Sequence, residues 1–196
     1  VAENAYAQVI KLTPPEDPSA EKIMNNLAAA IYKQGEEANS VEDYRTAADH
    51  FLRIATTAPG SEIRPIAQYD AASALIHLSN WSEAASVLES FRDSYPEHEL
   101  SAEATRQVAF VYREDGNLAR SAEEYVRVAD EAKELELRRE ALLVAAELYE
   151  EAELITEALA TFDTYVTQFT KPIEPAVVAR FKMAELFYEA GNEISR

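Results

Sequence analysis

The chain lacks cysteine altogether and has only four glycines among its 196 residues. Without cysteine there is no disulfide, no zinc–thiolate site and no thiol nucleophile. So few glycines argue against a turn-rich β-sandwich or barrel. Long apolar runs are lacking too, because residues 27–32 form about the longest one, far below the roughly 20 residues of a membrane span. We therefore expect no direct insertion into a membrane.

Positive charge is also in short supply. The chain carries 18 Lys and Arg residues against 36 Asp and Glu residues, a formal net charge of −18. A surplus of negative charge repels phosphate groups and anionic lipid. Nucleic acid and membrane surfaces are therefore not expected as partners.

A period of 37 residues runs through the sequence. Its anchors share the same spacing and are Tyr44, Trp81, Leu118 and Ile155. Three residues after each anchor stands a small residue, and seven after stands a large apolar one. These last are Phe51, Leu88, Tyr125 and Phe162. One small and one large contact on the same face indicate an amphipathic helix that begins at each anchor.

A further helix is predicted before each anchor, because small and large residues also keep register there. Nine residues before the last three anchors stand Ala72, Ala109 and Ala146, and six before stand Leu75, Tyr112 and Tyr149. The sequence therefore predicts an all-α chain of antiparallel helix pairs. It predicts one solenoid over residues 1–196, with repeats at about 1–14 (second half only), 18–59, 61–96, 98–133, 135–170 and 174–196 (first half only).

Turn and cap residues separate the predicted helices. Asn80 and Asn117 precede their anchors, where a short side chain accepts the free amides of the next helix. Asn80 with Glu83 and, more weakly, Ser40 with Asp43 resemble capping boxes. Pro59 and Pro96 are expected to end helices. The same holds for Gly35, Gly116 and Gly191, of which Gly116 supplies a positive φ.

The order small, large, turn, aromatic, Ala, large and Pro resembles the tetratricopeptide repeat. The likeness covers residues 1–192 and implies a right-handed superhelix of helix pairs. Repeats of that family usually have 34 residues, whereas the period here is 37. The first repeat departs further from the family pattern than the others. Tyr32 to Tyr44 spans 12 residues where Tyr112 to Leu118 spans 6, so we expect an insertion, as a longer helix or protruding turn, around residues 36–43.

A narrower likeness concerns the segment from Phe91 to Pro96 with Glu97 and Ala102. It resembles the longer repeats of bacterial envelope proteins, namely outer-membrane assembly lipoproteins and Tol-Pal coordinator proteins. The resemblance favours the periplasm or cell envelope over the cytoplasm. Both termini fall inside repeats, so the sequence is expected to be a piece of a longer repeat protein.

In the tetratricopeptide family the first helices line a concave groove that binds peptides, and the resemblance assigns groove positions here. The candidate binding residues are Tyr69, Ser73, Arg106, Phe110, Arg113, Glu147 and Glu150. The assignment also places Asn26, Ala30 and Lys33 of the first repeat, Ile76, Leu143, and Phe181, Glu185 and Tyr188 at the groove. The two arginines with the aromatics would hold an acidic peptide. The alternative is that these positions are solvated or pack against the next repeat.

Other kinds of site find little support in the sequence. A clamp for a chain-terminal carboxylate has only Asn26 and Lys33 to suggest it, and no second Asn follows at Ser73 or Phe110. The histidines show no metal-ligand spacing, although His77 is a candidate for ligand contact. No catalytic residue, metal or cofactor is predicted, and the carboxylates are typical of solvated helix faces.

The favoured function is therefore a non-catalytic scaffold for a protein or peptide partner. The alternative is a regulatory or recruiting segment of an enzyme whose catalytic domain lies outside this sequence. A third interpretation is self-association through apolar faces at the repeat ends. The identity of the partner cannot be read from residues whose pattern is set by stacking.

Overall fold

The computed structural model describes residues 2–14 and 16–194, of which 189–194 are described by their backbone alone. This part of the chain is all-α, as the period predicted. It contains ten helices, which are α1 (Ala2–Leu12), α2 (Ala20–Ser40), α3 (Tyr44–Thr57), α4 (Arg64–His77), α5 (Trp81–Ser94), α6 (Ser101–Glu114), α7 (Leu118–Glu131), α8 (Leu135–Glu151), α9 (Ile155–Gln168) and α10 (Ile173–Ile194).

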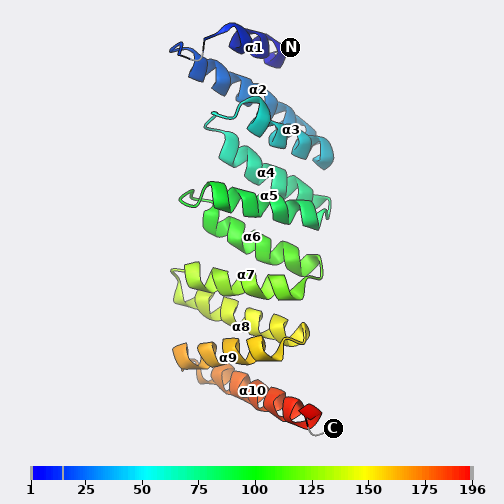
Figure 1. Cartoon of the computed structure of the whole chain (residues 1–196), viewed down its shortest axis with the longest axis vertical. Helices are drawn as coiled ribbons and strands as arrows, with labels where there is room; N and C mark the ends of the chain where they lie inside the picture. The colour runs from blue at the N-terminus through cyan, green and yellow to red at the C-terminus, as the bar shows by residue number, and fades with distance from the viewer. Residues whose placement is uncertain (1, 15, 195–196) are drawn as a thin grey trace. The chain divides into compact units, whose positions relative to one another are not determined.

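The chain forms two compact units, Val1–Ala104 (unit 1) and Thr105–Arg196 (unit 2), and the division falls within α6. In unit 1 the packed neighbours are α1 and α2, α2 and α3, α3 and α4, and α4 and α5. In unit 2 the same holds from α7 to α10. Figure 1 shows the successive helices of each unit running back and forth side by side. That both units form one solenoid with the predicted repeat boundaries stays a prediction.

The period of 37 residues is visible in the helices themselves. The second helices of the repeats are α3, α5, α7 and α9, each 14 residues long, and they begin at the four predicted anchors. The first helices α2, α4, α6 and α8 end at Ser40, His77, Glu114 and Glu151, again at intervals of 37. Both confirm the register that the anchors predicted.

The turn inside each repeat has the same backbone geometry four times. The residue two before each anchor has a positive φ, and these residues are Glu42 (63°), Ser79 (54°), Gly116 (76°) and Glu153 (59°). In the repeat with Gly116, its N–H donates to the Arg113 carbonyl, and the Asn117 N–H donates to the Tyr112 carbonyl at 2.9 Å. The other three turns repeat both bonds. This pattern is a Schellman motif, in which one left-handed residue satisfies the last carbonyls of a helix.

The predicted position of the insertion in the first repeat, around residues 36–43, was wrong. The turn of residues 41–43 has the same length as the others, and the additional residues extend the start of α2 to Ala20. Gly35 does not end α2 but lies buried inside it, at the position of Ala72 and Ala109. A Cβ on Gly35 would lie 2.5 Å from Cε1 of Phe51. Glycine is needed here because the Phe51 ring fills the space of a side chain.

Two of the capping predictions need correction. Asn117 accepts a hydrogen bond from the Arg120 N–H, as predicted, and Asp43 does the same with Thr46. Asn80 makes no such bond, because its amide donates to Glu83 Oε2 at 2.6 Å instead. Ser40 is the last residue of α2 and its hydroxyl donates to the Glu37 carbonyl. The N-cap of α3 is therefore Asp43.

Proline is not required to end the second helices. All four end at the same place in the register, although α7 and α9 have no proline there. At the end of α7, Arg138 donates from Nε to the Ala129 carbonyl and from Nη2 to the Ala132 carbonyl. An arginine from the following helix thus satisfies carbonyls that would otherwise lack partners. The expectation for Gly191 was also wrong, since α10 continues past it to Ile194.

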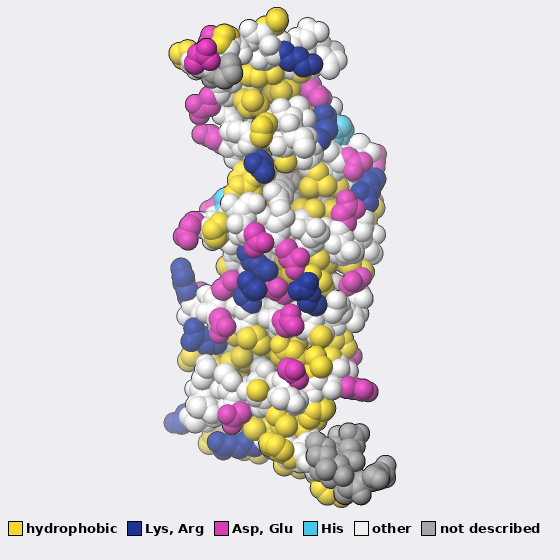
Figure 2. Space-filling view, viewed as in Figure 1, with side chains coloured by type: hydrophobic (Ala, Val, Ile, Leu, Met, Phe, Trp, Pro, Cys, Tyr) yellow, Lys and Arg dark blue, Asp and Glu magenta, His cyan; other side chains and the backbone are white. Residues whose placement is uncertain are grey.

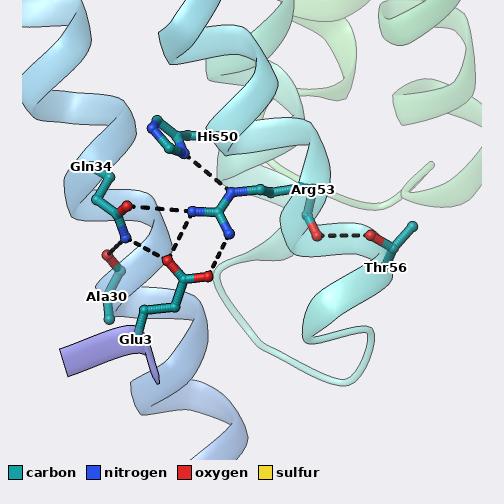
Figure 3. Close-up of polar contacts among 6 residues, drawn as sticks. All are labelled: Glu3, Ala30, Gln34, His50, Arg53 and Thr56. Atoms are coloured by element: carbon teal, nitrogen blue, oxygen red, sulfur yellow. Dashed lines mark hydrogen bonds and ion pairs between the residues drawn. The ribbon is translucent and has the colours of Figure 1, made fainter. Parts of the chain in front are cut away.

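A polar network ties α1 to the first repeat. The carboxylate of Glu3 accepts hydrogen bonds from Arg53 Nη1 at 2.5 Å, from Arg53 Nη2 at 3.0 Å and from Gln34 Nε2 at 2.9 Å. His50 Nδ1 accepts from Arg53 Nε (Figure 3). The bonds from Arg53 and Gln34 lower the pKa of Glu3 to about 2. The ionised carboxylate therefore stabilises the packing of α1 on α2 and α3.

Candidate functional site

The predicted groove residues lie on the first helices of their repeats. In unit 1, Tyr69 and Ser73 share a face of α4. Ser73 is exposed, and Tyr69 is half-buried with its ring 5.8 Å from that of Phe91. Both positions can therefore contribute to a surface on α4.

In unit 2 the predicted residues lie on α6 and α8. Arg106, Phe110 and Arg113 share one face of α6 at spacings of four and three, with Phe110 38% exposed and Arg113 exposed. On α8, Glu147 is exposed, and Glu150 accepts a hydrogen bond from Lys182 Nζ of α10 at 2.8 Å. This bond raises the pKa of Lys182. Each unit thus carries a mixed polar and aromatic face on its first helices, and binding at these residues stays a prediction.

The groove positions predicted for the first repeat were six residues out of register. Tyr32, Glu36 and Asn39 stand as far before the end of α2 as Tyr69, Ser73 and Ile76 stand before the end of α4. They replace the predicted Asn26, Ala30 and Lys33. The error arose because Gly35 stands in place of the expected alanine, so Tyr32 was aligned with Tyr112. The suggested carboxylate clamp loses its basis with this correction.

The corrected positions line a hollow of about 370 Å³ between α2 and α4, which we call the α2/α4 hollow. This volume lies near the lower end of the range for small-ligand sites. Its walls come from α2, α3 and α4, and the residues that line it are Tyr32, Glu36, Asn39, Ser40, Phe51, Asp70 and Ser73.

A hydrogen bond between α2 and α4 forms one wall of the hollow. The Tyr32 hydroxyl donates to Asp70 Oδ2 at 2.5 Å. Burial, followed by the bond to Asp70 and the charges of Asp70 and Glu36, raises the pKa of Tyr32. Burial also raises the pKa of Asp70, and the bond from Tyr32 partly offsets this. Tyr32 therefore stays a neutral donor that orients the Asp70 carboxylate.

Two aromatic rings stand beside these carboxylates. The rings of Tyr32 and Phe51 lie 5.1 Å apart and are tilted by 46°. The buried Phe51 ring thus meets Gly35 on one side and the hollow on the other. No lysine or arginine is among the residues that line the hollow. The α2/α4 hollow consequently combines apolar ring surface with two carboxylates, Glu36 and Asp70, that form no ion pair among the described residues.

Sequence analysis missed this hollow for a definite reason. Tyr32 and Asp70 are 38 residues apart, one more than the period, so their contact joins different register positions. An acidic residue on the inner face of α4 gave no signal among 36 Asp and Glu residues. The available signal was the 37-residue spacing from Tyr69 to Tyr32, which the misplaced insertion obscured.

His77, the histidine considered for ligand contact, stacks on Tyr44. The ring centroids are 4.6 Å apart and the planes meet at 11°. The stacking joins the last turn of α4 to the start of α3, the second helix of the preceding repeat. His77 therefore has a packing role in unit 1.

The described part of the chain holds neither a candidate metal site nor a candidate membrane span. No group of three or more His, Cys, Asp or Glu residues there is placed to hold a metal ion. None of the helices described is long and apolar enough to cross a membrane.

Comparison with known families identifies one repeat in the sequence. Residues 66–98 match the family model of the tetratricopeptide repeat. The matched range begins in the first turn of α4 and contains all of α5, the first and second helix of one repeat. This repeat is typically non-catalytic and is used to bind other proteins, and no catalytic family was detected. The search of curated proteins found no match.

Proposed function

We propose that the chain is a protein-interaction scaffold whose first helices present the binding surface for a peptide or protein segment. One observation carries the proposal. The helix pairs keep one geometry at intervals of 37 residues, while the outward positions of the first helices change from Glu36 to Ser73, Phe110 and Glu147. In repeat proteins the constant positions stack the repeats and the variable ones select the partner.

The face of α6 is the part proposed to meet an acidic segment. Phe110 offers exposed ring area between Arg106 and Arg113, and guanidinium groups form strong, charge-assisted hydrogen bonds with carboxylates. On a chain with a net charge of −18, such a basic site would stand out from its surroundings. Binding there should weaken as salt rises.

A charge reversal tests this proposal. Acidic peptides selected from a random display library would be titrated against the wild-type chain and the double variant Arg106→Glu/Arg113→Glu. We expect at least about a tenfold loss of affinity, since each lost charge-assisted bond is worth about 1 kcal/mol at a surface. The matched control is Lys133→Glu/Lys171→Glu, which makes the same change of charge at two exposed positions away from α6. Equal affinities for the two double variants would contradict the proposal.

A second proposed role is self-association through the ends. On α10, Val177, Val178 and Phe181 are more than half exposed, and Figure 2 shows hydrophobic side chains at the end of the chain where α10 lies. On α1, Val9 and Leu12 are exposed. A second helix packs on a first helix in the pairs α2/α3, α4/α5 and α8/α9, so α1 of a second copy suits the exposed apolar residues of α10.

Sedimentation velocity over a range of concentrations tests the self-association. We expect the wild-type chain to associate and Val178→Glu/Phe181→Glu to remain monomeric. Val41→Glu, at an exposed valine in the turn before α3, is the control. A wild-type chain that is monomeric at every concentration would contradict this role.

We also propose a place in the bacterial periplasm or cell envelope, supported by the likeness of residues 91–96 to envelope repeat proteins. Fractionation of cells that express the native gene tests it. Recovery of the protein from the cytoplasmic fraction would contradict the proposal.

A further inference from the structure

The α2/α4 hollow is the described cavity with the most distinctive chemistry, and it concerns a different ligand from the α6 face. We propose that it binds a basic side chain, lysine or arginine, of a partner segment. This inference deepens the proposed scaffold function and rests on it.

The charge of the hollow favours a cation. Glu36 and Asp70 line the hollow, and neither forms an ion pair among the described residues. Asp70 Oδ2 accepts from the Tyr32 hydroxyl, while the second oxygen of Asp70 accepts no hydrogen bond from the described residues. Arg45, a cation of the adjoining helix α3, pairs with Glu83 and Asp49 instead. The hollow therefore holds negative charge that the described residues do not neutralise, and a cation would find acceptor atoms there.

The apolar surface of the hollow suits the stem of a long basic side chain. Lysine and arginine carry long apolar stems that pack on rings while the charged end stays with polar partners. Phe51 and Tyr32 supply such rings beside the carboxylates. The side chains of Asn39 and Ser73 add neutral oxygens as acceptors. A ring face also attracts a cation directly.

The hollow is also preorganised for a ligand. Tyr32 and Asp70 come from α2 and α4, which are rigid helices of unit 1 that contact each other. Their hydrogen bond fixes the carboxylate before any ligand arrives. Gly35 allows the Phe51 ring to approach α2 closely beside this wall. A ligand would thus meet a site that is already formed, which reduces the entropy cost of binding.

The experiment uses three acetylated and amidated pentapeptides, which place lysine, norleucine or diaminopropionic acid between two alanines on each side. Norleucine keeps the apolar stem without the charge, and diaminopropionic acid keeps the charge on a short stem. Amide chemical shifts of the whole ¹⁵N-labelled chain would be followed at about 0.15 M salt, to screen diffuse attraction. We expect the lysine peptide to bind at least about tenfold tighter than the other two. The shifts should be centred on Tyr32 and Ser73.

Two variants locate the binding. Asp70→Asn keeps an acceptor for the Tyr32 hydroxyl but removes the charge, and we expect at least about a tenfold loss of lysine-peptide affinity. Ser73→Lys places a resident ammonium group in the hollow from an exposed position, so it should also abolish binding. The controls make the same charge changes at exposed positions of α5, Asp93→Asn and Ser82→Lys, and should leave affinity unchanged.

Some outcomes overturn the inference. Equal affinities for the three peptides, shifts spread over the acidic surface, or equal losses in the α5 controls would each show diffuse attraction in place of a site. If Asp70→Asn fails to fold, Ser73→Lys still decides the question. A failure here leaves the binding of acidic peptides to the α6 face untouched, because that test uses Arg106→Glu/Arg113→Glu. The two proposals therefore fail separately.

Discussion

The four left-handed turn residues allow a prediction about stability. Substitution by glycine should stabilise the chain at the three non-glycine residues, and replacement of Gly116 should destabilise it. A non-glycine residue in this conformation costs about 1 to 2 kcal/mol. Glycine escapes that cost but loses about 0.5 to 1 kcal/mol more conformational entropy on folding. Ser79→Gly should therefore raise the free energy of unfolding by about 0.5 to 1 kcal/mol. Gly116→Ala should lower it by a similar amount.

Because these residues have few side-chain contacts, the changes in the free energy of unfolding should come mainly from the backbone. A Cβ added at Gly116 would meet no atom within 4 Å, so the cost of Gly116→Ala comes from the backbone alone. Glu42, Ser79 and Glu153 are exposed, and their side chains form no hydrogen bond with the other described residues. Glu42→Gly and Glu153→Gly should therefore stabilise by the same amount as Ser79→Gly. Loss of side-chain contacts does not enter the comparison.

Urea unfolding followed by far-UV circular dichroism measures these differences. The control is Ser86→Gly at an exposed position inside α5, which should destabilise by about 0.5 to 1 kcal/mol because glycine is a poor helix former. Destabilisation by all three glycine substitutions in the turns, equal to that of Ser86→Gly, would contradict the assignment of backbone strain to this position.

Two further predictions concern unit 1. Gly35→Ala should lower the free energy of unfolding by about 1 to 2 kcal/mol in the same urea assay, because its Cβ would overlap the Phe51 ring. Phe51→Leu in the Gly35→Ala background should restore part of this stability. If it restores none, the overlap with Phe51 is not the cause. Because the pKa of Glu3 falls from 4.5 to about 2 on folding, its ionised form stabilises the chain above pH 4.5, and the gain is lost as pH falls toward 2. Solvent screens the partly exposed pair with Arg53, so we expect Glu3→Gln to cost about 1 kcal/mol at pH 7 and almost nothing near pH 2. A cost independent of pH would contradict this role of Glu3.

Much of the fold could be predicted because stacking imposes a strict pattern on the sequence. The anchors Tyr44 and Leu118 mark the first residues of α3 and α7, since a buried face of a helix must be apolar at each repeat. The left-handed turn could be predicted only at Gly116, because glycine is the residue type that readily adopts a positive φ. Ser79 and Glu153 adopt the same backbone under the same hydrogen bonds without any residue type that announces it.

The candidate site could be predicted only in outline. The face of α6 follows from helix geometry, and Phe110 and Arg113 are exposed on it, while their place in a binding groove stays a prediction. The α2/α4 hollow depends on a contact between Tyr32 and Asp70 from different repeats, and no local pattern encodes which partner a side chain meets in the next repeat. Gly35 also made the register of the first repeat hard to recognise, because glycine has no side chain to mark the position that alanine occupies in the other repeats.

The most direct test of the scaffold proposal compares the two kinds of helix. Peptides selected from a random display library against the whole chain would be titrated against arginine substitutions at exposed register positions of the first helices, Ser73, Phe110 and Glu147. The matched set on the second helices consists of the exposed residues Ser86, Glu123 and Ala160. The proposal predicts that substitutions in the first set, at one or more of the three positions, reduce affinity at least about tenfold while the second set leaves it unchanged. Losses confined to the second set, or equal in both, would contradict it.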